Sequence, residues 1–436
     1  MKKGSGKSIC LVIALSIILG CLGCKAKTTN KEDKTAAFRK REYIGSQETY
    51  GLYPGSLPCV GKPQIVVIVI DFLDDEEFEY SLDDINNRFF DIENYKNGIQ
   101  PIKGKDNDYF SLRDFYLRAS YGKLDINGSC YSYTTLHEKA YYQDAYSLVE
   151  EVMLAFDGEK IDWASFDGNS DGYVDGLYFV LRNYPQFPTP HFVATCDFQR
   201  AGLKIYQFAF IVGMATASGV QTLAHETCHM FGLPDIYGGV YLNKNGSGAN
   251  TIMDGPDYAL GDLPGIMKYI LDWVEPQFVD ELAATEYSLR SFSVSTDCLV
   301  VFPHGDKNNN NWFFIEYITA EENNFYTEVE TGGGLRIWRL TMDPEFSHED
   351  FFPMNSPYTY LEAIHHEGKW DYFLYSGDCF TPHTTLNSNY PLTFMPYTNG
   401  GIAMDKMQDS GIYLQDIKIV DGKASFSIMI ANSTKR

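Results

Sequence analysis

Beyond residue 24, this chain of 436 residues has no apolar run that approaches eighteen residues, which argues against a later membrane-spanning helix and predicts a soluble body. Cysteine is also sparse there, because only six of the nine cysteines follow position 24 and they are widely separated. That spacing excludes a small scaffold held together by disulfides. No internal repeat of fixed period stands out, which excludes a simple repeat architecture.

Basic residues are few, with 35 Lys and Arg against 58 Asp and Glu and a net charge of −23. Residues 1–45 hold ten of the basic residues and only three acidic ones, so the rest of the chain is more acidic than the total indicates. Such a body repels phosphate backbones, which argues against nucleic acid as a partner and favours divalent cations. The 44% hydrophobic content supports a large core, and the length is typical of two or three domains.

The N-terminus has the pattern of an export signal. Three lysines precede an apolar run over residues 9–19, which is followed by Gly-Cys at Cys21 and again at Cys24. This resembles a bacterial lipoprotein signal, so residues 1–24 are predicted to be a signal peptide with lipid on one of the two cysteines. The polar residues 25–59 are expected to form a flexible tether. We therefore expect a cell-surface or outer-membrane lipoprotein that contacts the membrane only through its lipid anchor, with extracellular release or plain secretion as alternatives.

Short apolar runs and amphipathic segments alternate in the first part of the body. Residues 64–72 and 176–181 are rich in apolar and β-branched side chains, which is typical of strands buried on both faces. Residues 122–128 are predicted to form a strand that enters a turn. Helices are predicted at 81–90, 111–116, 145–156 and 220–231, the first two capped by Ser81 and Ser111. We expect residues 60–282 to form one domain of mixed α and β structure.

From about residue 285 the pattern changes to short aromatic and β-branched runs broken by Gly, Asn and Pro. Strands are predicted at 299–302, 312–318, 334–340, 412–419 and 424–430. This is an all-β signature and favours a sandwich-like domain over residues 283–436, with the border near 278–286.

Two histidines four residues apart are the strongest chemical signal in the chain. His225 and His229 lie on one face of the predicted helix, so both imidazoles can reach one metal ion. Glu226 lies on the adjoining face, beside the position of a metal-bound water. Gly232 can adopt a positive φ and end the helix, so the chain can turn back. Asp235 can then supply a third ligand from outside the helix.

Two neutral nitrogens, one carboxylate oxygen and an open fourth position are the pattern of a catalytic zinc site, because structural sites are closed. Such an ion lowers the pKa of a water and polarises a carbonyl, and Glu226 is placed to take the proton as general base. The Gly and Asp after the second histidine make this motif more specific than the two histidines alone. Cys228, inside the motif, is expected to be an unpaired residue that packs the helix.

A second motif has the spacing of a calcium loop. Its oxygen donors at positions 1, 3, 5, 7 and 9 are Asp167, Asn169, Asp171, the Tyr173 carbonyl and Asp175. Gly172 stands at position 6, but position 12 is Tyr178 where a complete loop has a bidentate Glu. The sequence therefore predicts a structural calcium site with lower affinity or with a ligand from another segment. An Asx-rich turn without an ion is the alternative.

Several segments together resemble the immune-inhibitor-A-like secreted bacterial metallopeptidases, which are relatives of the metzincin zincins. The similar segments cover most of residues 60–430: 111–124, Leu223–Glu226, the turn at Met253, 264–276, 314–316, 333–339 and 412–430. The resemblance implies an α+β zincin-type catalytic domain, with a mixed sheet and an active-site helix, followed by an all-β, sandwich-like C-terminal domain. Cys228 and Asp272 depart from the family, which usually has Gly at both positions.

The resemblance also implies roles for individual residues. His225, His229 and Asp235 are the expected zinc ligands, Glu226 the general base and Met253 the Met-turn beneath the metal, although a lone Met is more often core packing. Calcium is expected at Asp167–Asp175. Tyr237 and Tyr258 are candidates for stabilising the transition state.

The expected function is a zinc-dependent metalloendopeptidase that hydrolyses peptide bonds of extracellular proteins, with one catalytic zinc and a structural calcium. The alternative from another class is a cell-surface lipoprotein that binds glycan or protein and has a non-hydrolytic zinc site. A zinc hydrolase of non-peptide bonds is a third reading. Glu226 favours hydrolysis, because a purely structural zinc site has no need for a base beside it.

Overall fold

The computed structural model describes residues 54–76, 80–92, 111–156, 160–213, 219–233, 235, 251–253, 261–309, 311–324, 332–341 and 408–432, together with the backbone of four short strands between residues 360 and 402. The predicted signal peptide, most of the predicted tether, Tyr237 and Tyr258 lie outside the described residues. The last residues of the predicted tether are packed, because Leu57 and Cys59 are buried. The packed chain therefore begins before position 60.

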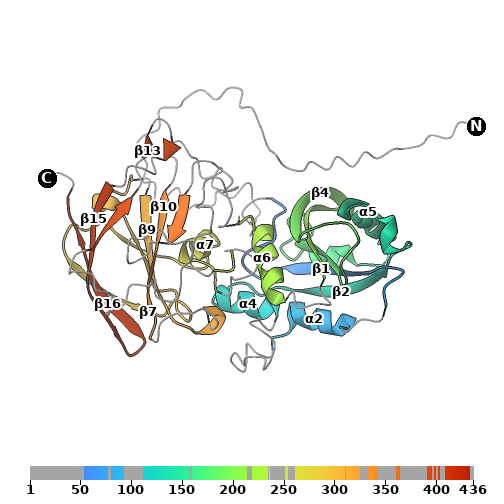
Figure 1. Ribbon diagram of the computed structural model, residues 1–436, viewed down its shortest axis with the longest axis horizontal. Coiled ribbons are helices and arrows are strands. Elements are labelled where there is room, and N and C mark those ends of the chain that lie inside the picture. Colours follow the sequence, from blue (N-terminus) through green and yellow to red (C-terminus); the bar gives the residue numbers. More distant parts are fainter. Residues whose placement is uncertain are drawn as a thin grey trace, which may run out of the picture.

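A five-stranded mixed sheet forms the centre of the first region (Figure 1). Its strands are β1 (Gln64–Asp71), β2 (Asn127–Thr134), β3 (Gly176–Leu181), β4 (Phe192–Arg200) and β5 (Leu203–Ile211). The order is β2-β1-β3-β5-β4, and all neighbours are parallel except β4, which runs antiparallel to β5 at the edge. The strands predicted at 64–72 and 176–181 are confirmed. The strand predicted at 122–128 is wrong, because positive φ angles at Tyr121 and Gly122 close a turn and the strand begins only at Asn127.

Helices pack on both faces of this sheet. They are α2 (Leu82–Phe90), α4 (Leu112–Ala119), α5 (Ala145–Ala155) and α6 (Val220–Phe231), with short 3-10 turns η1 (Lys139–Tyr141) and η2 (Trp163–Phe166). The predicted caps are confirmed, since Ser81 and Ser111 accept hydrogen bonds from the backbone N–H groups of Asp84 and Asp114. The helix predicted at 111–116 extends to Ala119.

Alternation along β1 explains why the sheet has a hydrophobic core on each face. Ile65, Val67 and Val69 belong to one buried cluster together with α2, α4 and α6. Val66, Ile68 and Ile70 point the other way and belong to a second cluster together with α5. Because successive side chains of a strand face opposite sides, an unbroken apolar run is what a sheet covered on both faces requires.

The second region is rich in β structure. One sheet has the order β11-β10-β9-β8-β6, another has the order β12-β15-β16-β7, and β13 and β14 form a pair. The elements after α6 are α7 (Gly265–Ile270), β6 (Gln277–Val279), β7 (Thr285–Arg290), β8 (Cys298–Val301), η3 (Pro303–Gly305), β9 (Asn311–Ile318), η4 (Glu322–Asn324), β10 (Gly334–Thr341), β11 (Tyr360–Ala363), β12 (Tyr390–Phe394), β13 (Tyr397–Thr398), β14 (Gly401–Ile402), β15 (Gln408–Val420) and β16 (Lys423–Ile430). The change to β structure predicted from the sequence is confirmed, and its first strand, β6, begins just before the predicted border.

The sheet that contains β9 is buried on both faces. Phe313 and Ile315 belong to a cluster shared with β15 and β16, so the two sheets pack against each other. Phe314, between them, belongs instead to the cluster of α4, α6 and α7. The hydrophobic core therefore continues across the predicted domain border, and in Figure 1 the helices α4 and α6 lie between the first sheet and the β-rich region. None of the described helices is long and apolar enough to cross a membrane.

Candidate metal centre

The helix that carries the two histidines has well-defined ends. Gly219 is its N-cap, and Gly232, with a φ of 105°, is its left-handed C-cap. The N–H of Leu233 donates to the carbonyl of Cys228 at 2.9 Å, which satisfies a carbonyl of the last turn. The helix end predicted at Gly232 is confirmed. Only glycine adopts this backbone conformation at little cost, so Gly232 allows the chain to reverse and to return toward the helix at position 235.

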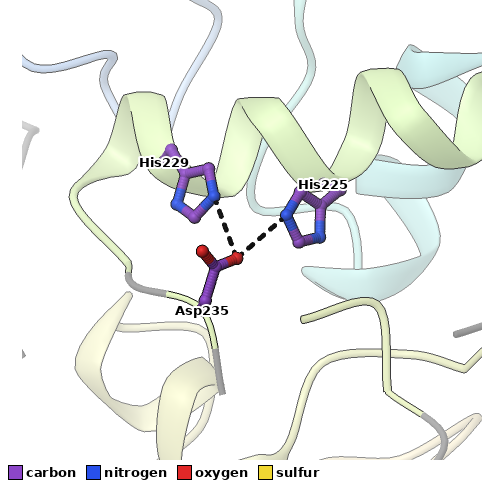
Figure 2. Close-up of side chains that lie close together, drawn as sticks. All are labelled: His225, His229 and Asp235. Carbon is purple, nitrogen blue, oxygen red and sulfur yellow. Dashed lines mark ion pairs between the residues drawn. The ribbon is translucent and has the colours of Figure 1, made fainter. Parts of the chain in front are cut away.

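His225, His229 and Asp235 converge on one point (Figure 2). The Oδ1 atom of Asp235 lies 3.1 Å from Nε2 of His225 and 3.2 Å from Nε2 of His229. A metal bound tetrahedrally at about 2.1 Å to each ligand would space the ligand atoms about 3.4 Å apart, close to these distances. Among the described residues, no other three His, Cys, Asp or Glu side chains bring their ligand atoms within 4.8 Å of one another.

Backbone carbonyls fix the hydrogens of both imidazoles. Nδ1 of His225 donates to the carbonyl of Ile252 at 2.8 Å, and Nδ1 of His229 donates to the carbonyl of Leu233 at 2.7 Å. A carbonyl can only accept, so each Nδ1 carries a hydrogen and, in the neutral ring, each Nε2 presents a lone pair. Two lone pairs thus face the carboxylate of Asp235, and Oδ1 of Asp235 is buried without a hydrogen bond among the described residues. A cation at this point would satisfy all three atoms.

The electrostatics of the trio also favour a bound positive charge. Burial lowers the pKa of His229, but the adjacent carboxylate of Asp235 outweighs this effect, so the pKa is raised. Burial raises the pKa of Asp235, but its contacts with His225 and His229 hold that pKa well below its ordinary value. Both shifts stabilise a proton between ring and carboxylate. A divalent cation would meet the same demand without protonating the rings.

Glu226 lies beside this trio and is buried, with 6% of its surface exposed. Burial raises the pKa of its carboxyl, while the neighbouring His229 and His225 lower it and Asp235 raises it further. The net shift is upward, so the carboxylate is more basic than an exposed Glu. This is the direction that a general base needs.

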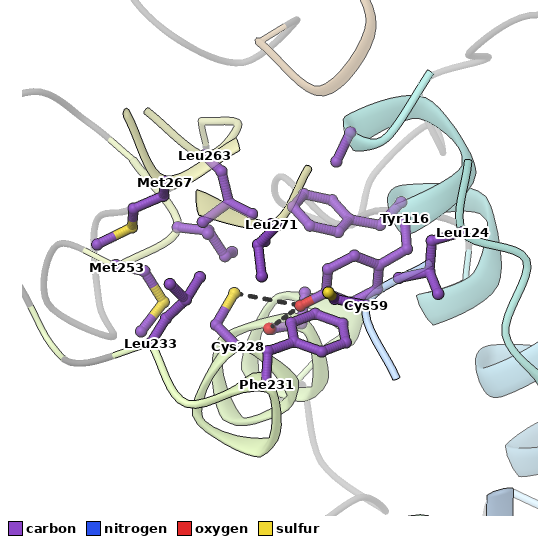
Figure 3. Packing of buried hydrophobic residues seen from close by; sticks show 14 of the residues in the cluster. Cys59, Tyr116, Leu124, Cys228, Phe231, Leu233, Met253, Leu263, Met267 and Leu271 are labelled. Carbon is purple, nitrogen blue, oxygen red and sulfur yellow. Dashed lines mark hydrogen bonds between the residues drawn. The ribbon is translucent and has the colours of Figure 1, made fainter. Parts of the chain in front are cut away.

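The opposite side of α6 is held by two buried tyrosines. The hydroxyl of Tyr116, on α4, donates to the carbonyl of Ala224 at 2.6 Å and lies 3.2 Å from Sγ of Cys228 (Figure 3). The hydroxyl of Tyr178, on β3, lies 2.9 Å from Oγ1 of Thr227. Cys228 is a free, fully buried thiol, as predicted.

Met253 is fully buried in the same cluster as Cys228 and Leu233 (Figure 3). It follows Ile252, whose carbonyl accepts from Nδ1 of His225, so this turn contacts the histidine cluster through a backbone atom. The sequence pointed to Met253 but not to the Ile252 carbonyl.

The acidic loop at 167–175 is arranged differently. The two carboxylate oxygens of Asp167 accept from the backbone N–H groups of Asp171 at 2.9 Å and Gly172 at 3.0 Å. Asn169 accepts from the N–H of Asp171 at 3.2 Å, and Asp171 accepts from the N–H of Tyr173 at 2.9 Å. These oxygens therefore shape the loop, and its carboxylates do not meet the distance criterion that the histidine site meets.

Asp175 is the exception in this loop, because it is buried and only one of its two carboxylate oxygens accepts hydrogen bonds from the described residues. Its Oδ2 accepts from the backbone N–H groups of Gln64 at 2.7 Å and Gly168 at 3.0 Å. Its Oδ1 has no hydrogen bond among the described residues. Burial raises the pKa of Asp175 to about 7, although the two backbone N–H groups lower it. A cation near Oδ1 would relieve this cost.

His191 was not singled out by its spacing in the sequence. Its Nδ1 accepts from the N–H of Val212 at 3.1 Å, so the neutral ring carries its hydrogen on Nε2. Burial lowers the pKa of His191, and so does the charge of His225. The ring of His191 is therefore close enough to His225 to interact with it electrostatically. The contact joins the beginning of β4 to the end of β5, which spacing along the chain does not reveal.

Comparison with known proteins adds no assignment. No model of a protein family matches the sequence, and no significant match is found among curated proteins. In the structure, α6 and the segment after it bring two histidines, one aspartate and a buried glutamate close together.

Proposed function

We propose that this chain is a zinc-dependent endopeptidase that cleaves extracellular proteins, with His225, His229 and Asp235 as the metal ligands. The observation that carries the proposal is the meeting of two Nε2 lone pairs and one carboxylate oxygen, with the hydrogens of both rings taken up by carbonyls. Two nitrogens and one oxygen from the protein are the ligand set of catalytic zinc sites, which leave a further position open.

The residues around the proposed ligands have different roles in catalysis. When bound, zinc would supply Lewis acidity and lower the pKa of a water molecule. Glu226 accepts the proton of the attacking water and returns it to the leaving amine, for which its raised pKa is suited. The carbonyls of Ile252 and Leu233 hold the two imidazoles in the required tautomer. The buried position of Glu226 keeps bulk water from competing for its carboxylate.

A zincin-type catalytic domain is the finer fold assignment within this proposal. It is supported by the mixed sheet with an antiparallel edge strand, by α6 packed on that sheet and by the buried Met253 turn beside α6. The sandwich-like packing of the following sheets fits the same assignment.

A structural calcium at the 167–175 loop is also part of the proposal. Support comes from the buried, unused Oδ1 of Asp175 and from the raised pKa of that carboxyl. The loop is fixed to the sheet, because Gln64 of β1 donates to Asp175 and the N–H of Val174 donates to Lys204 of β5. An ion there would stiffen the connection between these strands.

Export with a lipid anchor rests on the sequence of residues 1–24 alone. In that setting the substrates would be proteins or peptides outside the cell. The acidic body and its net charge of −23 disfavour nucleic acid as a substrate.

The proposal is tested by comparing wild type with Glu226→Ala in a proteome-wide search for new protein N-termini, with zinc supplied. Wild type should generate new termini that chelator abolishes, and Glu226→Ala should generate none while it retains zinc. Glu150→Gln, which changes an exposed acid on α5, is the matched control and should behave as wild type.

Zinc-loaded wild type that produces no new termini from any substrate would contradict the endopeptidase. If that protein bound glycan or another protein tightly instead, the site would be a non-hydrolytic one in a surface-binding lipoprotein.

A further inference from the structure

Three buried basic side chains, which form four ion pairs, lie where the first region packs against the β-rich region. Arg118 of α4 pairs with Asp114 and with Glu322 of η4. Lys268 of α7 pairs with Asp262 at 2.6 Å, and Arg336 of β10 pairs with Glu316 of β9. Except for Glu322, each of these side chains is at most 5% exposed. Buried ion pairs contribute little net stability, but they demand one geometry of the groups around them.

Glu316 fixes the beginning of α7. Its Oε1 accepts from Nε1 of Trp338 at 2.9 Å and from Arg336, and its Oε2 accepts from the backbone N–H of Gly265 at 2.9 Å. A Cβ at Gly265 would overlap the ring of Phe314, so the backbone can approach β9 this closely only with glycine. A fully buried carboxylate of the β-rich region therefore sets the position of α7.

The segment before α7 is fixed at a second point. Nζ of Lys268 donates to Asp262 and lies 3.2 Å from the hydroxyl of Tyr121. The backbone N–H of Asp262 donates to Oδ1 of Asn324, in η4, at 2.9 Å. Residues 262–268 are thus held by β9 on one side and by η4 on the other.

This fixed segment packs beneath the metal-binding helix. Leu263 and Met267 share a buried cluster with Met253 and Cys228 (Figure 3). Met253 follows Ile252, whose carbonyl accepts the hydrogen of His225. The position of α7 is therefore transmitted by packing to the turn that orients a metal ligand.

A second connection reaches the opposite side of α6 through α4. Arg118 of α4 pairs with Glu322, and Nδ2 of Asn323 donates to the carbonyl of Phe115 at 2.9 Å. Tyr116, on the same helix, donates to the carbonyl of Ala224 one residue before His225. The β-rich region therefore supports α6 from two sides.

We propose that the β-rich region is a positioning element of the metal centre, which acts directly through Glu316 and indirectly through α4, whose Tyr116 contacts α6. Glu316 holds α7 and the Met253 turn in the position from which Ile252 orients His225. Tyr116 connects α6 to α4, and α4 in turn contacts η4. The inference rests on the metal site of the proposed function, but it does not depend on peptide hydrolysis.

The test compares Glu316→Gln and Tyr116→Phe with Asp297→Asn in the full-length protein. Asp297 pairs with the exposed Arg290 in the same β-rich region, so this control removes a carboxylate charge without touching either connection. Two quantities are measured: amide hydrogen exchange of α6 and α5 in metal-free protein, and zinc affinity by competition with a chromophoric chelator. Both positioning variants should bind zinc about tenfold more weakly, because displacing α6 or the Ile252 carbonyl would weaken the hydrogen bond that orients His225, and such bonds contribute about that much.

Exchange in α6 should become about tenfold faster in both positioning variants, while α5, on the other face of the first sheet, stays as in wild type. Asp297→Asn should change neither quantity. A folded Glu316→Gln with wild-type exchange in α6 and wild-type zinc affinity would overturn the proposal. If Glu316→Gln does not fold, Tyr116→Phe decides, and wild-type exchange and affinity in that variant would overturn it equally.

A failure of the proposed function would give a different result from a failure of this inference. Wild type that binds no zinc removes the metal site, yet the exchange comparison in metal-free protein still shows whether Glu316 and Tyr116 hold α6.

Discussion

The histidine site and the acidic loop both contain the spacing of a metal-binding motif, but their side chains are used in opposite ways. In the histidine site, carbonyls take up the Nδ1 hydrogens, and both Nε2 atoms face Oδ1 of Asp235. In the loop, backbone N–H groups donate to both oxygens of Asp167 and to Oδ1 of Asp171. In the histidine site, the side chains direct their ligand atoms at one common point. In the loop, the side chains form hydrogen bonds with the loop's own backbone.

Because of this difference, a metal at the histidine site would contribute mainly to function and an ion at the loop mainly to stability. A metal at the histidine site would lie where the ligand atoms of three side chains converge, so its loss should affect function first. An ion at the loop would add to a turn that its own hydrogen bonds already support. Its main gain would be relief of the buried carboxylate of Asp175.

Glu226→Gln should lower kcat by about 10²–10⁴-fold, because the amide cannot accept the proton of the attacking water. Zinc content should remain that of wild type, since Glu226 is not one of the three converging ligands. Peptide cleavage and metal analysis of the same preparation measure both. Undiminished kcat in a zinc-loaded variant would show that another group is the base.

Asp235→Asn should weaken zinc binding by more than the 10–100-fold that loss of a supporting hydrogen bond costs, because a charged ligand is lost. The fold should persist, since Asn has the same shape. Competition with a chelator measures the affinity, and Asp162→Asn, at an exposed position, is the control. Equal affinities of variant and wild type would exclude Asp235 as a ligand.

Asp175 should make the metal-free protein less stable as the pH rises. Its pKa is raised from 3.8 to about 7, so the folded state keeps a proton that the unfolded state releases. The stabilisation is complete below pH 3.8 and is lost as the pH rises through about 7. We expect a loss of about 2 kcal/mol from this group, after allowing for relaxation of the buried site.

The measurement is urea unfolding from pH 5 to pH 8 in chelator. Asp175→Asn should flatten the profile, and calcium should restore stability of wild type at pH 8 by mass action. A profile with the same slope in variant and wild type would assign the pH dependence to other groups.

Asp167→Asn should have the smallest effect, about 1 kcal/mol, because one of two hydrogen bonds to the loop backbone is lost. Thermal unfolding in chelator measures it. Zinc affinity should be unchanged, and a fall in that affinity would mean that the loop and α6 are coupled.

The parts of the site that could be predicted are those set by local geometry. The spacing of His225 and His229 fixes their common face, and Gly232 fixes the end of the helix. The carbonyl of Leu233 is four residues from His229 and belongs to the same local structure. Contacts between distant segments, such as Ile252 with His225 or Tyr116 with Ala224, could not be predicted. No pattern within either segment indicates which distant residue it contacts.

The fold shows the same division. Buried strands such as β1 and capped helices such as α4 follow from patterns within a few residues. The β4–β5 hairpin was missed because its turn, Ala201-Gly202, lacks the Asn or Asp that normally marks two residues with positive φ, which both residues have. The shared core across the domain border depends on Phe314 facing away from its neighbours, which only the packing of three layers reveals.

Anomalous diffraction at the zinc edge, from crystals of the zinc-loaded protein, would show whether the three side chains bind the metal. We expect one strong peak about 2.0–2.2 Å from Nε2 of His225, Nε2 of His229 and Oδ1 of Asp235, with no fourth protein ligand. A peak elsewhere, a peak with a fourth protein ligand closing the coordination, or no peak between these three atoms would contradict it.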